Sequence, residues 1–481
     1  MAKDLRSFLA QLASRPGDLL TIERPVRPGE FEVTALLQQI ERKHPCPAVL
    51  FRNPIDLYGQ PSPFPLFTNA YASRERCALM LDVDPATPHF AVGLAYGAKA
   101  RGTIAPLVVS SDRAPVHETI WRGAEADVGR LPIVRHFEMD MGPTLTMTHV
   151  MRSVSGHYNV SFAKTFYKWD PRQMVVSLHT RDVVRILKEW EDRGEPAPIV
   201  NILGHHPAFH LGSLSRNPWG VDDYATLGSF LGEPLRLTPS VTWGDRFMVP
   251  ADAELVIEGE IPLGKRDLCD PFGEVARLYQ AQCLRPIFDT TAISFRRGAI
   301  MQDIFSGFRD SFPLGALLKE AALDAALRPS FPNLKEIHSP DSGCGVFAVY
   351  ISVRGIEPGQ AQEIGRIALE TFGVVQCVVV VDDEIDVFDE SQVLWAIHTY
   401  ASFAKGFKTA GNWSASRAVA HVVAGGPQAG FSTTNWGGKV VVDATRPRDF
   451  AFGARSAVPQ EILDRMRLAD FLPSAYAAGA R

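Results

Sequence analysis

The stretch Asp270-Pro271-Phe272-Gly273-Glu274 sets a carboxylate immediately after a Pro-Phe-Gly turn in a chain of 481 residues. Pro and Gly at these positions favour a tight turn that would hold the Glu274 side chain in one orientation. A carboxyl group in a partly apolar pocket suits general acid catalysis, because burial favours its protonated form. The ordinary alternative is a turn carboxylate exposed to solvent, which is the commoner position of a Glu residue.

The chain around this turn is rich in predicted strands. Segments with β-branched and aromatic residues in partial alternation are bounded there by Gly, Pro and Asp. The predicted strands are 145–154, 159–167, 175–178, 235–242, 253–261 and 292–295. A single predicted helix, 181–193, interrupts them and ends before Gly194.

The two flanking parts mix helices and strands. Before this region we expect helices at 31–42 and 73–81 and a strand at 48–51; after it, helices at 314–326, 360–372, 390–400 and 459–472 and strands at 344–353 and 374–381. The apolar strand 374–381 is typical of a buried parallel sheet. We therefore predict three parts, 1–105, 106–310 and 311–481.

Composition excludes several classes of protein. Hydrophobic residues make up 46% of the chain and charged residues 21%, as in ordinary globular proteins. The net charge is −5 and the Lys and Arg residues are scattered, which argues against a nucleic-acid partner. The six cysteines form no CxxC pair, and no apolar run is long enough to span a membrane. We expect a cytoplasmic protein with reduced thiols and no membrane partner.

Several further stretches, spread over most of the chain, resemble the UbiD family of prenylated-FMN-dependent decarboxylases. They are Thr68-Asn69 with 73–76; 140–144; 158–164; 249–251 with Glu254 and Glu258-Gly259, then 271–274; 382–387 with Trp395; and Gly438-Lys439 with 443–447. Their order along the chain matches the order in the family, which makes the resemblance specific for the fold.

The resemblance implies an α/β (α+β) fold, in which a split β-barrel that binds flavin lies between an N-terminal α/β region and a C-terminal α/β domain. That last domain would mediate a homodimer or homohexamer. The implied reaction is reversible, non-oxidative decarboxylation of a small unsaturated, aromatic or heteroaromatic acid. Prenylated FMN, made by an FMN prenyltransferase, would act as electron sink. Mn²⁺ or Mg²⁺, with K⁺ nearby, would link its phosphate to the protein.

The family's acid network, Glu–Arg–Glu, is altered in this chain. The resemblance makes Glu274 the proton donor, puts Lys164 at the Arg position and puts Cys269 at the other Glu position. Lys keeps the charge but loses the planar fork that grips a carboxylate. Asp270, one residue further on, could partly replace the missing Glu. Cys269 is then either a catalytic thiol or a small buried hydrophobe, as unpaired cysteines more often are.

The resemblance also implies contacts to the cofactor and the metal. The cofactor contacts would be Asn159, Ser161, Phe162, Ala163, Lys164 and Ser213. The metal ligands would be Asn159, His179 and Asp223, that is, two oxygen donors and one imidazole, a set that suits Mn²⁺ or Mg²⁺. Asp182 is the alternative to His179, and Asp222 is the alternative to Asp223. Both Asp222 and Asp223 could instead cap the helix that follows.

Three functions are compatible with this sequence. The leading one is a decarboxylase, with Lys164 holding either Glu274 or the substrate carboxylate. The second keeps prenylated FMN but performs an isomerisation or lyase reaction without release of CO2. The third is a non-catalytic partner subunit, because the replaced Arg and Glu positions are what loss of activity would leave behind.

Overall fold

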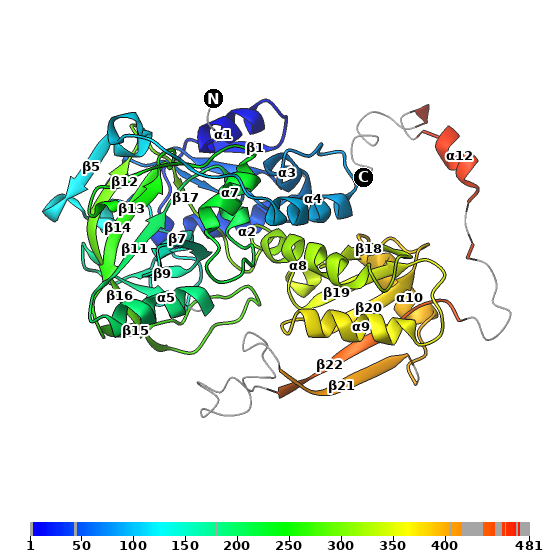
Figure 1. Cartoon of the computed structure of the whole chain (residues 1–481). Coiled ribbons are helices and arrows are strands. Elements are labelled where there is room, and N and C mark those ends of the chain that lie inside the picture. The colour runs from blue at the N-terminus through cyan, green and yellow to red at the C-terminus, as the bar shows by residue number, and fades with distance from the viewer. Residues whose placement is uncertain are drawn as a thin grey trace.

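The computed structural model of the chain describes residues 3–42, 46–178, 181–404, 406–414, 436–447, 455–456, 458–467 and 470–471. Figure 1 shows two lobes, a β-rich one and a smaller α/β one, with α8 (Phe312–Leu327) running between them. Within the described ranges, every helix is too short or too polar to cross a membrane.

A large sheet dominates the first lobe. Its hydrogen-bonded path is β6-β9-β10-β16-β14-β11-β7-β8, with β15 and β5 pairing to β16. These strands are β5 (Thr119–Arg122), β6 (Thr144–Leu145), β7 (Thr148–Arg152), β8 (Tyr158–Phe162), β9 (Lys164–Tyr167), β10 (Gln173–Ser177), β11 (Ala197–Ile202), β14 (Leu255–Ile261), β15 (Arg266–Cys269) and β16 (Cys283–Phe295).

Chain continuity shows that this sheet is curled. β8 lies at one end of the path and β9 lies next to the other end, yet only Ala163 separates them along the chain. The sheet therefore has to bend round until its two ends meet, which is the split barrel that the resemblance predicts. Helices α5 (Arg181–Asp192), α6 (Pro207–Gly212) and α7 (Asp223–Leu231) lie in the connections between its strands.

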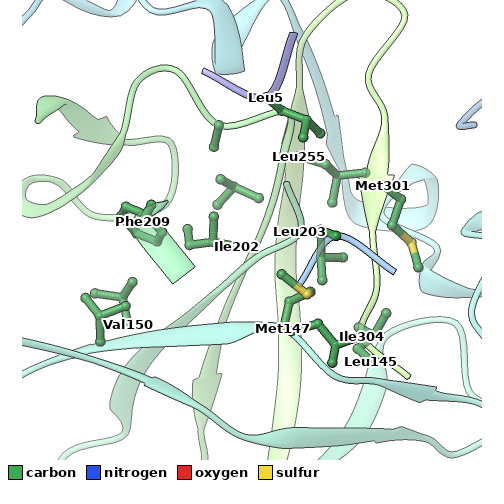
Figure 2. Packing of buried hydrophobic residues seen from close by; sticks show 14 of the residues in the cluster. Leu5, Leu145, Met147, Val150, Ile202, Leu203, Phe209, Leu255, Met301 and Ile304 are labelled. Atoms are coloured by element: carbon green, nitrogen blue, oxygen red, sulfur yellow. The ribbon is translucent and has the colours of Figure 1, made fainter. Parts of the chain in front are cut away.

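The N-terminal region is joined to the barrel by a shared sheet and a shared core. Strands β1 (Leu19–Ile22), β2 (Ala48–Phe51) and β3 (Leu66–Thr68) continue into β17 (Met301–Gln302). Figure 2 shows Leu5 of α1 (Leu5–Ala13) near Leu255 and Met301, and all three belong to one hydrophobic cluster. Because this cluster crosses residue 105, the expected boundaries near 105 and 310 stay predictions.

The remaining elements of the first lobe surround this core. They are α2 (Glu32–Ile40), α3 (Arg74–Met80), α4 (His89–Arg101) and a three-stranded sheet of β4 (Leu107–Val108), β12 (Arg236–Ser240) and β13 (Gly244–Pro250). We did not predict α4, because its apolar residues form no single stripe along the helix.

The second lobe is a five-stranded sheet covered on both faces. Its order is β18-β19-β20-β22-β21, and β19, β20 and β22 run parallel. The strands are β18 (Leu334–His338), β19 (Ala348–Val353), β20 (Cys377–Asp382), β21 (Phe407–Ser414) and β22 (Trp436–Asp443). Helices α8 and α9 (Gln360–Thr371) pack on one face and α10 (Glu390–Thr399) on the other. The buried parallel strand predicted at 374–381 is thus confirmed as β20.

Several predicted elements are shorter than expected, among them one strand and the last helix. The strand expected from residue 344 begins at Ala348, because Cys344 has a left-handed backbone with φ of 55° and ends a short 3-10 turn. The helix expected at 459–472 is α12 (Gln460–Arg465) in the described part of the chain. Residues 468, 469 and 472 of that prediction lie outside the described residues.

Candidate active site

Lys164 lies between two carboxylates that flank the Pro-Phe-Gly turn. Its Nζ is 3.1 Å from Asp270 Oδ1 and also forms an ion pair with Glu274 Oε1. The Asp270 side chain is fully buried, while Lys164 and Glu274 keep exposed fractions of 13% and 18%. The structure thus brings Lys164 and Glu274 together as predicted, and we call Lys164, Asp270 and Glu274 the acid triad.

The strands explain why these side chains meet. Lys164 begins β9, and Asp270 follows directly after β15, so both lie at the ends of strands of the curled sheet. The Phe272 ring, 4.8 Å from Lys164 Nζ, packs with Phe166 and Cys269 in a small hydrophobic cluster. This cluster packs apolar side chains against the acid triad.

Electrostatics keep the Lys164 ammonium charged. Burial lowers the pKa of Lys164, but the Glu274 and Asp270 carboxylates outweigh burial, so that the pKa lies above its usual value. A buried ammonium between two carboxylates is a fixed positive charge next to the Glu274 oxygens.

Asp270, rather than Cys269, supplies the second carboxylate. The Cys269 thiol is buried, and burial together with the Asp270 charge raises its pKa to about 12. Since the thiolate is the nucleophilic form, such a thiol is unreactive near neutral pH. Its Sγ lies 3.6 Å from Asp270 Oδ2, so Cys269 contacts the carboxylate that pairs with Lys164. A catalytic role for Cys269 stays a prediction.

Asp140 anchors the turn that carries Glu274, and we predicted no role for its side chain. One carboxylate oxygen accepts a hydrogen bond from Gly273 N at 2.9 Å. The other accepts from His136 N and Phe137 N at 3.2 and 2.9 Å. Met141 N also donates to Pro271 O at 2.9 Å. Asp140 begins one of the stretches that carry the resemblance, which was the available signal.

Two of the predicted metal ligands lie in contact. Asp223 Oδ2 accepts hydrogen bonds from Asn159 Nδ2 at 2.9 Å and from Val160 N at 2.8 Å, and Oδ1 accepts from Asn217 Nδ2 at 2.7 Å. Asp222 instead caps α7 by accepting from Tyr224 N. The contact between Asn159 and Asp223 favours Asp223 over Asp222 as the metal ligand.

Unsatisfied oxygens on β8 fit a bound cation and cofactor. Asn159 Oδ1 and Ser161 Oγ are buried and have no hydrogen-bond partner among the described residues. Such groups are rare in folded proteins and call for a ligand or a water. Carboxylate and amide oxygens are also the donors that Mn²⁺ and Mg²⁺ prefer.

The charge around Asp223 also fits a cation. Burial, above all, raises the pKa of Asp223 to about 7, and the Asp222 and Asp182 charges add to the shift. Asp182 lies in the first turn of α5, whereas His179 lies outside the described residues. In the described part of the chain, no three His, Cys, Asp or Glu residues form a metal site by themselves. The choice between His179 and Asp182 therefore stays open.

The other predicted cofactor contacts lie close to this strand. Ala163 is the buried link between β8 and β9, and the Phe162 ring lies 6.3 Å from the His210 ring. Ser213 is buried at the end of α6, and its Oγ donates to His210 O at 2.7 Å.

Three family models match the chain. The model described as the 3-octaprenyl-4-hydroxybenzoate carboxy-lyase N-terminal domain (UbiD_N) matches residues 10–93. The Rift-related domain of the same carboxy-lyase (UbiD) matches residues 107–308, and its C-terminal domain (UbiD_C) matches residues 313–444. Together they span most of the sequence.

Solved structures of such enzymes are similar over nearly the whole length. The UbiD-class enzyme HmfF from Pelotomaculum thermopropionicum, in complex with FMN, has a TM-score of 0.86 and 29% identity, covering 98% of this chain and 100% of that one. An evolved dimeric form of HmfF in complex with prFMN gives 0.84, with the same identity and coverage. A 3,4-dihydroxybenzoic acid decarboxylase from Enterobacter cloacae, at 23% identity, 96% and 99% coverage and a TM-score of 0.82, shares the fold.

Proposed function

This chain belongs to the UbiD family of carboxy-lyases, and we propose that it decarboxylates a small unsaturated, aromatic or heteroaromatic acid reversibly with prenylated FMN. The observation that carries the proposal is the ion-paired acid triad, with Lys164 between Asp270 and Glu274. HmfF, which is 29% identical, binds prFMN, and this supports the same cofactor here.

The strand β8 and its neighbours would hold the cofactor and its metal. Prenylated FMN supplies the electron sink for cleavage of the bond to CO2. We propose that Asn159, Ser161, Phe162, Ala163, Lys164 and Ser213 contact it. Asn159 Oδ1, Asp223 and either His179 or Asp182 would bind Mn²⁺ or Mg²⁺, with K⁺ nearby.

Glu274 would move the proton. When CO2 leaves, the carbon that carried it needs one proton, and protonated Glu274 donates it. The Lys164 ammonium then stabilises the new Glu274 carboxylate, which takes its next proton from solvent. Asp270 keeps Lys164 charged and in place. In the direction of carboxylation, Glu274 accepts the proton instead.

A headspace CO2 assay tests this function. The full-length protein, produced together with an FMN prenyltransferase, is incubated with a panel of acrylic, benzoic and furoic acids. The proposal predicts release of CO2 from at least one class of acid. Conversion of an acid without CO2 would favour the isomerase or lyase alternative, to which the change of Glu to Cys269 points. The intact acid triad argues against a non-catalytic partner subunit.

The proposal includes a homodimeric or homohexameric assembly in the cytoplasm, with an FMN prenyltransferase as supplier of the cofactor. The HmfF form in complex with prFMN is dimeric, which supports the assembly. Light scattering coupled to size-exclusion chromatography distinguishes these states, and a monomeric mass for the loaded protein would contradict it.

A further inference from the structure

A cavity of about 550 Å³ lies between α2 and the turn that carries Glu274. None of the three triad residues is among the described residues that line it, although Gly273 is. The Phe272 ring connects the two places, since it lies 4.8 Å from Lys164 Nζ and packs edge-on against His136, with ring centroids 5.4 Å apart. The cavity is therefore adjacent to the acid triad and separate from it.

Aromatic rings form much of the cavity wall. Phe305 and Phe308 stack with centroids 4.1 Å apart and an angle of 6° between their planes. Phe137 continues the stack, with angles of 26° and 20° to the same two rings. Nearly parallel rings favour a planar ligand that extends the stack. The volume also lies in the usual range for small-molecule sites, about 300–1,000 Å³.

Two lining residues, His136 and Arg277, carry nitrogen groups that can bind an anionic ligand. His136 is buried, its Nε2 lies 3.0 Å from Asp303 Oδ2, and its Nδ1 has no hydrogen-bond partner among the described residues. Burial lowers the pKa of His136, but the Asp303 carboxylate outweighs it and the pKa lies above its usual value. Arg277 lies over the Phe308 ring at 4.5 Å, and Glu41 Oε1 and Gly307 O hold its guanidinium there through Nη2 and Nε at 3.3 and 2.5 Å. The carboxylate among the described lining residues, Glu138, is exposed.

We propose that this cavity is a second binding site for a planar aromatic carboxylate, with its ring on the phenylalanine stack and its oxygens toward His136 Nδ1 and Arg277. The class of ligand rests on the proposed function, because the acid that the enzyme would decarboxylate belongs to it. A ligand here contacts Gly273, the neighbour of Glu274, so that occupancy restrains the catalytic turn.

Calorimetric titration of the full-length protein with benzoate tests the site, with cyclohexanecarboxylate as the non-planar comparison. Ala35→Trp fills the cavity from α2, since Ala35 lines it and is exposed. The matched control is Gln39→Trp, because Gln39 is exposed on the same helix and is not among the lining residues. Arg277→Gln removes the cation, and Lys164→Met changes the acid triad alone.

We expect saturable benzoate binding that Ala35→Trp and Arg277→Gln each weaken by about tenfold or more, while Gln39→Trp and Lys164→Met leave it unchanged. Cyclohexanecarboxylate should bind more weakly than benzoate. Absence of saturable binding, an unchanged affinity in Ala35→Trp, or a loss of binding in Lys164→Met would each overturn the proposal. The CO2 assay separates the two claims: CO2 release without cavity binding refutes the second site, and cavity binding without CO2 release refutes the decarboxylase.

Discussion

Lys164 lies where relatives of this chain are expected to carry Arg, and the structure shows how a single ammonium serves two carboxylates. Arg grips one carboxylate with a planar fork, whereas the Lys ammonium is a point charge with three donors. Lys164 can therefore bind Asp270 and Glu274 from different directions. With Asp270 and Glu274 the network has two carboxylates, although Cys269 lies where the resemblance implies a Glu.

The sequence allowed prediction of Glu274 and Lys164 and offered Asp270 as a partial replacement for the missing Glu, but it did not decide between Cys269 and Asp270. The spacing from Glu274 pointed to Cys269, and only the backbone decides between adjacent residues. Asp270 has a left-handed conformation, with φ of 65°, and its side chain lies beside Lys164. Such a one-residue change of direction at a turn has no signal in residue spacing.

Asp270→Asn and Cys269→Ala distinguish a carboxylate partner from a thiol. Removal of the Asp270 charge takes away one of the two carboxylates that keep Lys164 charged, so we expect kcat to fall by at least about tenfold. Cys269→Ala removes only a packing thiol and should retain most of the activity. Steady-state kinetics of CO2 release measure both variants, and an equal loss in Cys269→Ala would restore the thiol as a catalytic group.

Substitution of the metal ligands should act on cation binding before it acts on folding. Asn159→Ala removes an oxygen that has no other partner among the described residues, so we expect Mn²⁺ affinity to fall by about 10- to 100-fold with little change in Tm. Asn217→Ala is the comparison, because Asn217 donates a hydrogen bond to Asp223 but is not itself a predicted metal ligand. Titration followed by electron paramagnetic resonance measures free Mn²⁺, and equal affinity in Asn159→Ala and wild type would contradict the site.

At the scale of elements, the segment 136–141 holds the turn that carries Glu274 in place. Asp140 accepts hydrogen bonds from backbone groups on both sides, at Phe137 and Gly273. Loss of the Asp140 carboxylate would leave these buried N–H groups without an acceptor, and each such group destabilises the folded state by about 1–3 kcal/mol. Residue spacing could not show this contact, since Gly273 lies 133 residues from Asp140.

Asp140→Ala should therefore loosen the turn. We expect kcat to fall by about tenfold or more while KM changes little, together with a lower Tm. Asp245→Ala, at an exposed position of β13, is the control for loss of one negative charge. If Asp140→Ala lowers Tm but leaves kcat at the wild-type value, Asp140 is structural and does not position Glu274.

Helix α8 contains a buried lysine, Lys319, whose lowered pKa makes the stability of the folded protein depend on pH. Lys319 Nζ donates to Gly315 O and Gly345 O at 2.8 and 2.9 Å, and burial lowers its pKa from 10.5 to about 7. Between these two values the unfolded chain binds more protons than the folded one, so this residue makes the folded state more stable as pH rises from 7 to 10.5.

The Tm of wild type minus that of Lys319→Met should therefore increase with pH over this range. Differential scanning calorimetry at several pH values gives the difference directly. Lys335→Met, at an exposed position of β18, provides the control for loss of a lysine. A difference that stays constant or decreases would show that Lys319 is charged in the folded protein throughout.

At the scale of the whole molecule, the two lobes are joined by a buried ion pair. Arg74 on α3 forms an ion pair with Glu320 on α8, with Nη1 at 3.0 Å from Oε2, and the Glu320 side chain is fully buried. Glu320 also accepts from Ser339 N at 3.0 Å and lies 3.2 Å from His338 Nδ1. A buried carboxylate that loses its partner costs about 3–5 kcal/mol.

Arg74→Met should lower Tm by several degrees, and the double variant Arg74→Met/Glu320→Leu should recover part of the loss, because it removes the unpaired charge as well. Arg366→Met, on the exposed face of α9, is the control for loss of a surface ion pair. A double variant less stable than Arg74→Met alone would show that Glu320 stabilises the fold through its other contacts.

The overall architecture was predictable because separate stretches of sequence indicated the same fold. The contacts that join the N-terminal region to the barrel were not predictable. The resemblance predicted the split barrel, and the apolar pattern at 374–381 predicted the parallel sheet around β20. The pairing of β3 with β17 joins segments more than 230 residues apart, and the hydrophobic cluster shared by Leu5 and Leu255 crosses an expected boundary. Such contacts depend on the packed molecule, which the local pattern does not describe.

The central claim is that Glu274 donates the proton that replaces CO2. The most direct measurement is solvent deuterium incorporation, in D2O, at the product carbon that carried the carboxylate group, with the full-length enzyme loaded with prenylated FMN. Glu363→Gln, an exposed change on α9, serves as control. We predict that Glu274→Gln keeps its cofactor but loses deuterium incorporation by about 100-fold or more. Incorporation at the wild-type rate in Glu274→Gln would contradict the account.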